Sequence, residues 1–384
     1  MVREEISGRA RGEVREPAEP AQPAGLYVIV VCHRRCKVTG ACRSRIVRLP
    51  WYGVHGMADD GRAAPGAASA LLAYCALLVG FFAIGIVTQQ HDVIAGLWVT
   101  EALAIALPAV IAVRAQGVPA ARYLGFRTPR LSQLGIALLL AVLNQPVVSF
   151  LTWAARALSP PAWVEEFDAL QRVLDAVFAQ NATAMIVTVA IAAPFGEELF
   201  FRGYALPALA RSWGPTVAVL LTGAMFSVLH LNKIGFVGLW EIGILLALLR
   251  LWSGSLWPSM LCHAANNALA GAAFLLGWED PTVPPPPLLL AAGAVLLLVA
   301  LVAAVRVLRF NRAEPLAASQ EIVDPGRLDR LLAVTLIAIW LAAVGLGIAQ
   351  AARAIAPLPM SIWLLLSGGG TILALAPRFR PSSI

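Results

Sequence analysis

Side chains suited to acid–base chemistry interrupt the apolar second half of the chain in three short groups. In chain order they are Glu197, Glu198, Arg202, His230, His263 and Asn267. Ionisable residues inside apolar segments are costly in a bilayer and are functional-site hypotheses by default. A carboxylate and two imidazoles can activate a water molecule, and an amide can stabilise an oxyanion. Together the groups predict a hydrolytic site.

The first group has the spacing of an ion pair on a helix. Glu198 and Arg202 are four residues apart and share a helical face, with the acid N-terminal to the base, which is the favourable order. Glu197 points about 100° away around the helix axis and cannot share that pairing well. We therefore expect Arg202 to neutralise Glu198, while Glu197 faces a cavity and acts as a general base.

Each group also has a structural reading. A lone membrane histidine is more often a packing residue, and an asparagine in a span often joins two helices. The Glu–Glu–Arg group would also suit a buried ion pair or a proton relay. The catalytic reading is favoured because all groups lie within about seventy residues on consecutive spans. Glu101 and Glu241 stand apart, and a site role is less expected for them.

The elements that must position these groups are membrane-spanning helices. Of the 384 residues, 59% are hydrophobic and 13% charged, with a mean hydropathy of +0.76. Soluble domains are nearer 45–50% apolar and about 25% charged. This composition excludes a soluble globular enzyme, and the arginines between apolar runs do not suggest a nucleic-acid partner. We predict an all-α polytopic transmembrane helical bundle of about eight to ten spans. The expected spans are 67–87, 95–113, 133–153, 183–204, 214–231, 235–251, 256–276, 287–308, 330–351 and 360–376.

The loops indicate the orientation of the bundle. Arginines concentrate in 114–132, in 309–330 and in the C-terminal tail, whereas 88–94 and 277–286 carry no Lys or Arg. The positive-inside rule then predicts that both termini are cytoplasmic. Arg156, Arg172 and Lys233 are exceptions. The location predicted is the cytoplasmic membrane, and the Arg, Ala and Pro bias suggests a bacterial source.

Three regions are expected along the chain. Residues 1–66 are rich in Arg and Pro and are expected to be a disordered tail, with Met57 as an alternative start. Residues 67–280 would form the membrane core with all three polar groups. Residues 281–384 would add C-terminal transmembrane helices. Within the core, 154–182 is amphipathic and is expected to lie at the membrane interface.

The three groups together resemble the CPBP family of intramembrane proteases, which includes the type II CAAX prenyl endopeptidases. The family pattern is EExxxR, FxxxH and HxxxN. The matching residues here are Glu197-Glu198-x-x-x-Arg202, Phe226-x-x-x-His230 and His263-x-x-x-Asn267. Each motif alone is weak, but their order on consecutive apolar segments is a strong signal. The resemblance covers roughly residues 130–280.

The resemblance implies roles for these residues. Glu197 and His230 would activate water, while His263 and Asn267 would stabilise the oxyanion. Whether a divalent metal such as zinc takes part is left open, and its ligands would be Glu197, His230 and His263.

Glu198, Arg202 and Phe226 would support the site. The activity implied is an intramembrane endopeptidase that cleaves a membrane-associated peptide or protein. The alternative is a catalytically silent peptide-binding or bacteriocin-immunity membrane protein. A transporter is less favoured, because the polar groups lie in one half of the chain without an inverted repeat.

Antiparallel spans pose a geometric problem for Glu197 and His230. They would lie near opposite ends of consecutive helices. The two can meet only if the helix that carries Glu197 continues beyond Gly203, or if the following helix starts shallow and ends deep in the membrane. We expect the former arrangement, with a water-filled cavity open to the cytoplasm.

Overall fold

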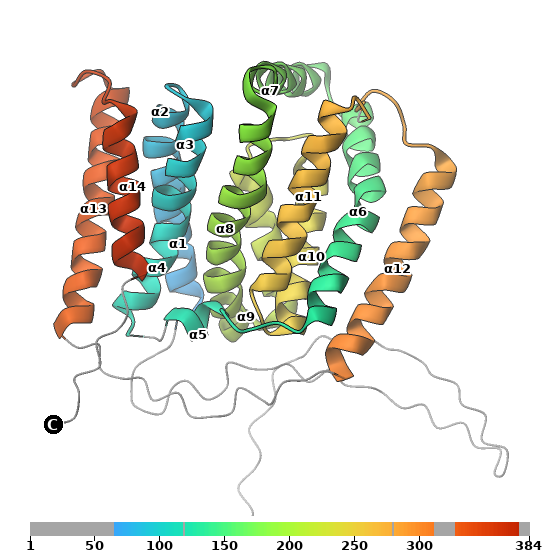
Figure 1. Cartoon of the computed structure of the whole chain (residues 1–384), viewed down its shortest axis with the longest axis horizontal. Helices are drawn as coiled ribbons and strands as arrows, with labels where there is room; N and C mark the ends of the chain where they lie inside the picture. The colour runs from blue at the N-terminus through green and yellow to red at the C-terminus, as the bar shows by residue number, and fades with distance from the viewer. Residues whose placement is uncertain (1–64, 118–119, 279, 311–326, 376–384) are drawn as a thin grey trace, which may run out of the picture.

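The computed structural model describes residues 65–117, 120–278, 280–310 and 327–375 (Figure 1). All regular elements within these ranges are helices, so the predicted all-α membrane bundle is confirmed. The expected tail at 1–66 lies almost entirely outside the described residues. Most of the helices run side by side, and α7 lies across one end of the bundle.

Two bent helices and a third long helix form the first half. The two bent helices meet in a short turn. There Asp92 caps the second of them by accepting a hydrogen bond from Ala95 N at 2.8 Å. The elements are α1 Ala67–Gly80, η1 Phe81–Gly85, α2 Ile86–Gln89, α3 Val93–Val99, η2 Thr100–Ala106, α4 Leu107–Ala115, α5 Ala120–Leu124 and α6 Leu131–Leu158. The η elements are π-helical turns, which are often found at functional sites.

A long helical stretch then carries the first polar group. Its elements are α7 Pro161–Val187, η3 Thr188–Ala192, α8 Ala193–Glu198, η4 Leu199–Ala205 and α9 Leu206–Leu229. The backbone leaves helical geometry at Asn181 and at Gly214, where φ is +80° and Pro215 follows. Helix therefore continues ten residues past Gly203 before the chain reverses. The expected extension of the Glu197 helix is confirmed, and it brings the end of α9 back toward Glu197.

The remaining helices are α10 Phe236–Ser253, α11 Trp257–Leu275, α12 Pro287–Phe310, α13 Arg327–Ala351 and α14 Met360–Leu375. The C-terminal helices do not form one layer. Helix α12 packs on α6, whereas α13 and α14 pack together on the opposite flank against α4 and η2 (Figure 1). The polar helices α8 to α11 lie between these flanks.

All ten expected spans coincide with helix in the described residues. Six helical segments meet a length and hydropathy criterion for crossing a membrane, and 287–302 and 360–374 are apolar but shorter. The count is lower than ten partly because 161–229 is counted once, although its 69 residues bend at Asn181 and Gly214. One crossing needs only about 20 residues. The polar residues of α11 also lower its hydropathy.

Two glycines bring α9 and α10 into close contact. A Cβ atom on Gly243 would lie 2.8 Å from the Cα of Gly223, so neither position leaves room for a side chain. Small residues at helix crossings allow this approach in membranes. The crossing places the backbone of α10 within reach of the Arg202 side chain.

Candidate active site

A buried ion pair forms the base of the site. The Arg202 Nη1 donates to Glu198 Oε1 at 2.7 Å, and both side chains are fully buried. The Arg202 Nη2 donates to the carbonyl of Gly243 at 2.9 Å. Its guanidinium also lies over the Phe226 ring, 4.6 Å from the centroid. The predicted pairing of Arg202 with Glu198 is therefore present.

His263 joins the two glutamates. Its Nδ1 lies 3.1 Å from Glu198 Oε1, and its Nε2 lies 3.6 Å from Glu197 Oε2. A carboxylate bonded to one ring nitrogen fixes the orientation of the ring, so the other nitrogen is aimed at its target. Phe226 packs edge-on against this imidazole, with 5.5 Å between ring centroids. Glu198 thus orients His263 toward Glu197.

His230 reaches the other carboxylate oxygen of Glu197. Its Nε2 lies 4.0 Å from Glu197 Oε1, and its Nδ1 lies 2.9 Å from the carbonyl of Phe226. A carbonyl only accepts, so Nδ1 carries the proton and Nε2 faces Glu197. The gap of 4.0 Å is too long for a direct hydrogen bond. One water molecule would bridge it.

Exposure marks the entrance to the site. The side chain of His230 is 31% exposed, whereas those of Glu197 and His263 are 7% and 4% exposed. His230 directly follows α9, and the next turn is fixed to α7, because Lys233 Nζ lies 2.6 Å from Glu166 Oε2. Of these three side chains, His230 is therefore the one nearest the protein surface, toward the α7 end of the bundle.

Asn267 lies on the same face of α11 as His263 but is occupied elsewhere. Its Nδ2 donates to the carbonyl of Val189 in η3 at 2.8 Å. This contact joins α11 to the helix that carries Glu197. An asparagine in a membrane span often joins two helices in this way. The predicted role of Asn267 as an oxyanion donor stays a prediction, and it requires this hydrogen bond to open or to be shared.

Two acidic residues outside the three motifs make contacts with other helices. Glu241 Oε2 accepts a hydrogen bond from Asn144 at 2.9 Å, which joins α10 to α6. Glu101, in η2, lies against Gly196 so closely that a Cβ atom at residue 196 would overlap its Oε2. Both acids thus have contacts on other helices, and the low expectation of a site role for them stays a prediction. Spacing along the chain gave no signal for these contacts, because each joins residues on two different helices.

The close contact at Gly196 has a testable consequence. In a Gly196→Ala variant the new methyl group must displace either Glu101 or α8, and α8 carries Glu197. Because a small displacement of a catalytic group can cost on the order of a hundredfold in rate, we expect a loss of that size. Gly135→Ala in α6 is the matched control, since a Cβ atom there meets nothing within 4 Å. Peptide cleavage by the two purified variants measures the difference, and equal rates would refute this reading.

The two ends of the bundle differ in charge. The end with α5 carries basic residues from several helices and loops, namely Arg114, Arg122, Arg127, Arg130, Arg211 and Arg250. The end with α7 carries acids of α7 and of the turn before α3, namely Asp92, Glu165, Glu166, Asp168 and Asp175, together with the basic residues Arg156, Arg172 and Lys233. If the arginine-rich end is cytoplasmic, the site opens on the other side of the membrane. The expectations of cytoplasmic termini and of a cavity open to the cytoplasm both stay predictions.

The orientation can be tested by thiol labelling. We expect Lys233→Cys, in a variant lacking the native cysteines, to react with a membrane-impermeant maleimide on intact cells. Thr128→Cys, which is exposed between α5 and α6, should react only after the membrane is opened. The charge asymmetry is the reason for this assignment. The reverse labelling pattern would place the site on the cytoplasmic side.

Glu197, His230 and His263 carry side-chain atoms of the kind that bind a metal ion. Two imidazole nitrogens and a carboxylate are suitable in kind for zinc. Within the part of the chain that the structure describes, however, no three or more His, Cys, Asp or Glu side chains are arranged to hold a metal ion. Their positions do not fit a preformed metal centre.

The fold and site define a polytopic helical membrane protein with a buried Glu–His centre. Residues 179–269 match the model of a family described as type II CAAX prenyl endopeptidase Rce1-like, which confirms the resemblance for that segment. The match covers all three polar groups and supports a CAAX-type intramembrane protease at the level of the family. Searches of curated proteins and of solved structures gave no match.

Proposed function

We propose that the protein is an intramembrane endopeptidase in which Glu197 and His230 activate water. One observation carries the proposal: the Glu197 carboxylate lies between the Nε2 atoms of His230 and His263, at 4.0 and 3.6 Å. Both Nδ1 atoms are engaged, by the Phe226 carbonyl and by Glu198. Both rings are therefore held with Nε2 toward one carboxylate, which suits the handling of a proton there.

The proposed reaction needs only water and these side chains. A water molecule between Glu197 and His230 gives one proton to Glu197, and its oxygen bonds to the carbonyl carbon of the peptide. The carbonyl oxygen becomes an oxyanion, to which His263 as imidazolium and Asn267 would donate. When the C–N bond breaks, Glu197 returns the proton to the leaving amine. A carboxylic acid and an amine are released, and Glu197 is restored.

A divalent metal is the other way to activate the water, and zinc would be bound by Glu197, His230 and His263. Since the described positions do not form a ligand cluster, the ligands would have to move closer on binding. Metal content decides this point directly. Zinc that copurifies with the wild type in stoichiometric amounts, and is lost in His230→Ala, would support the metal route.

The proposed substrates are peptides or proteins at the membrane. The likeness to CAAX-type proteases suggests cleavage close to the end of a membrane-anchored chain. In a bacterial cytoplasmic membrane, suitable substrates would be a peptide pheromone, a bacteriocin-like peptide or a C-terminal sorting signal. An entrance at the α7 end would suit substrates exposed outside the cytoplasm.

A comparison of peptides in host membranes tests the function. We expect a defined peptide or protein terminus to appear with the wild type and to be missing with Glu197→Gln at equal expression. If the two peptide sets match while gene deletion still has a phenotype, the silent peptide-binding alternative is supported. The geometry disfavours that alternative, because a binding site gains nothing from two imidazoles oriented toward one carboxylate.

A further inference from the structure

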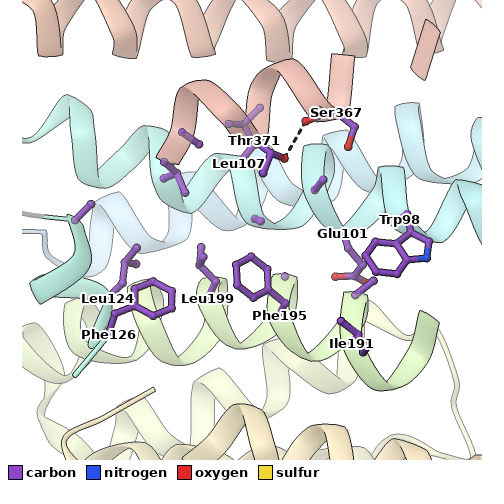
Figure 2. Close-up of a pocket in the computed structure, with 18 of the residues that line it drawn as sticks. Trp98, Glu101, Leu107, Leu124, Phe126, Ile191, Phe195, Leu199, Ser367 and Thr371 are labelled. Atoms are coloured by element: carbon purple, nitrogen blue, oxygen red, sulfur yellow. Dashed lines mark hydrogen bonds between the residues drawn. The ribbon is translucent and has the colours of Figure 1, made fainter. Parts of the chain in front are cut away.

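A cavity lies beside α8, away from the side chains of the candidate active site. It has a volume of about 770 Å³ and is bounded by α3, η2 and α4, by η3 and α8, and by α14 (Figure 2). Its size is in the range of small-molecule sites, which is about 300–1,000 Å³. Neither Glu197 nor Glu198 lines it. The cavity is therefore separate from the candidate active site, although both use α8.

The wall of this cavity is mostly apolar and partly open to the bilayer. Its large side chains include Leu107, Leu124, Phe126, Ile191, Phe195 and Leu199. Ile191 and Phe195 are exposed, so this wall reaches the outer surface of the helix bundle, which faces the bilayer in a membrane-spanning protein. An apolar chain that leaves the bilayer would enter here without losing a hydrocarbon environment.

The Glu101 carboxyl in the wall has a buried oxygen without a hydrogen-bond partner among the described residues. Three others are partnered: Trp98 Nε1 donates to Thr188, Thr371 donates to the Ser367 carbonyl, and Arg114 donates to the Ala374 carbonyl. Glu101 is 6% exposed, and its Oε2 has no hydrogen-bond partner among the described residues. A buried carboxyl oxygen without a donor is costly, so it favours a ligand that brings one.

Glu101 lies at one end of the cavity, beside Trp98 and next to the helix that carries Ile191 (Figure 2). The apolar side chains extend from there to Leu124 and Phe126 at the other end. A ligand that fits this layout has a long apolar chain and a donor at one end. A hydrocarbon tail alone would leave the carboxyl unsatisfied.

We propose that this cavity binds a single-chain lipid that carries a hydroxyl or amide donor, with the donor bonded to Glu101 and the chain along α4 and α8. Because Glu101 also contacts Gly196, next to Glu197, an occupied site would fix the position of α8. The proposal is independent of the activity, since it requires only binding.

Photo-cross-linking in phosphatidylcholine nanodiscs tests it. The probe is a diazirine-bearing long-chain fatty alcohol, and its methyl ether is the comparison, because the ether keeps the chain and loses the donor. We expect the alcohol to label cavity residues roughly fivefold to tenfold more than the ether, as for one buried hydrogen bond. Glu101→Leu should abolish the difference, whereas Glu101→Gln, which keeps an acceptor oxygen, should retain it.

A blocking variant supplies the second arm. Gly368 lines the cavity and Gly369 does not, and a Cβ atom at either position meets nothing within 4 Å. Gly368→Phe should lower labelling by the alcohol to background, and Gly369→Phe should label like the wild type. Equal labelling by alcohol and ether would show that the cavity admits only bilayer hydrocarbon and would overturn the proposal. Unchanged labelling of Gly368→Phe would overturn it as well.

Discussion

Glu197→Gln is expected to lower the rate of peptide cleavage by roughly a hundredfold to ten-thousandfold, the range for loss of a general base. The amide keeps the size of the side chain but cannot accept the proton of water. Insertion and folding should persist, because the fully buried ion pair of the site belongs to Glu198 and Arg202 instead. Cleavage of a fixed amount of substrate by purified protein measures the loss.

The control for this substitution is Glu165→Gln. Glu165 is an exposed glutamate of α7, so it tests the effect of removing one negative charge near the entrance. Its rate should stay within about twofold of the wild type, since exposed charges contribute little. A fully active Glu197→Gln would end the mechanism with Glu197 as base.

Arg202→Ala is expected to cause the largest loss of stability. Removing one partner of a buried ion pair leaves an uncompensated charge and costs about 3–5 kcal/mol of unfolding free energy. Here the substitution would leave the buried Glu198 charge unpaired, which lowers stability. It would also remove the hydrogen-bond donor to the Gly243 carbonyl. Unfolding in mild detergent, followed by intrinsic tryptophan fluorescence, measures the change.

Arg172→Ala is the matched control, because this arginine is exposed on α7. A double variant, Glu198→Leu with Arg202→Met, separates stability from activity. Replacing both ions with apolar groups should recover much of the stability. Activity should stay low, because His263 loses the carboxylate that orients it. An Arg202→Ala variant as stable as the wild type would contradict the ion-pair account.

The sequence was most informative where one periodicity or one spacing decided the answer. The apolar runs predicted the helices, and the spacing of four residues predicted the pairing of Glu198 with Arg202. The family pattern brought His230 and His263 to Glu197, and the structure places each imidazole within 4.0 Å of the Glu197 carboxylate. The same reasoning predicted that the Glu197 helix passes Gly203.

Contacts between distant helices were not readable from the chain. The link from Glu241 to Asn144 joins residues 97 positions apart, and the close approach of Glu101 to Gly196 depends on how two bent helices cross. The role of α14 in a cavity wall was missed because its short, glycine-rich segment has no polar motif. The spacing of residues within one helix does not predict such contacts between helices.

The Glu198 Oε1 atom is shared by Arg202 and His263, at 2.7 and 3.1 Å. One oxygen of Glu198 therefore both neutralises the Arg202 charge and fixes the orientation of the His263 ring. On an evolutionary path, a substitution at any of these three residues changes the other two at once, so single steps away from the trio lose function before a new arrangement is reached. Such a protein can diversify more easily in α14, which lines the cavity, and in α7, near His230. Substitutions there do not disturb the Glu198 oxygen.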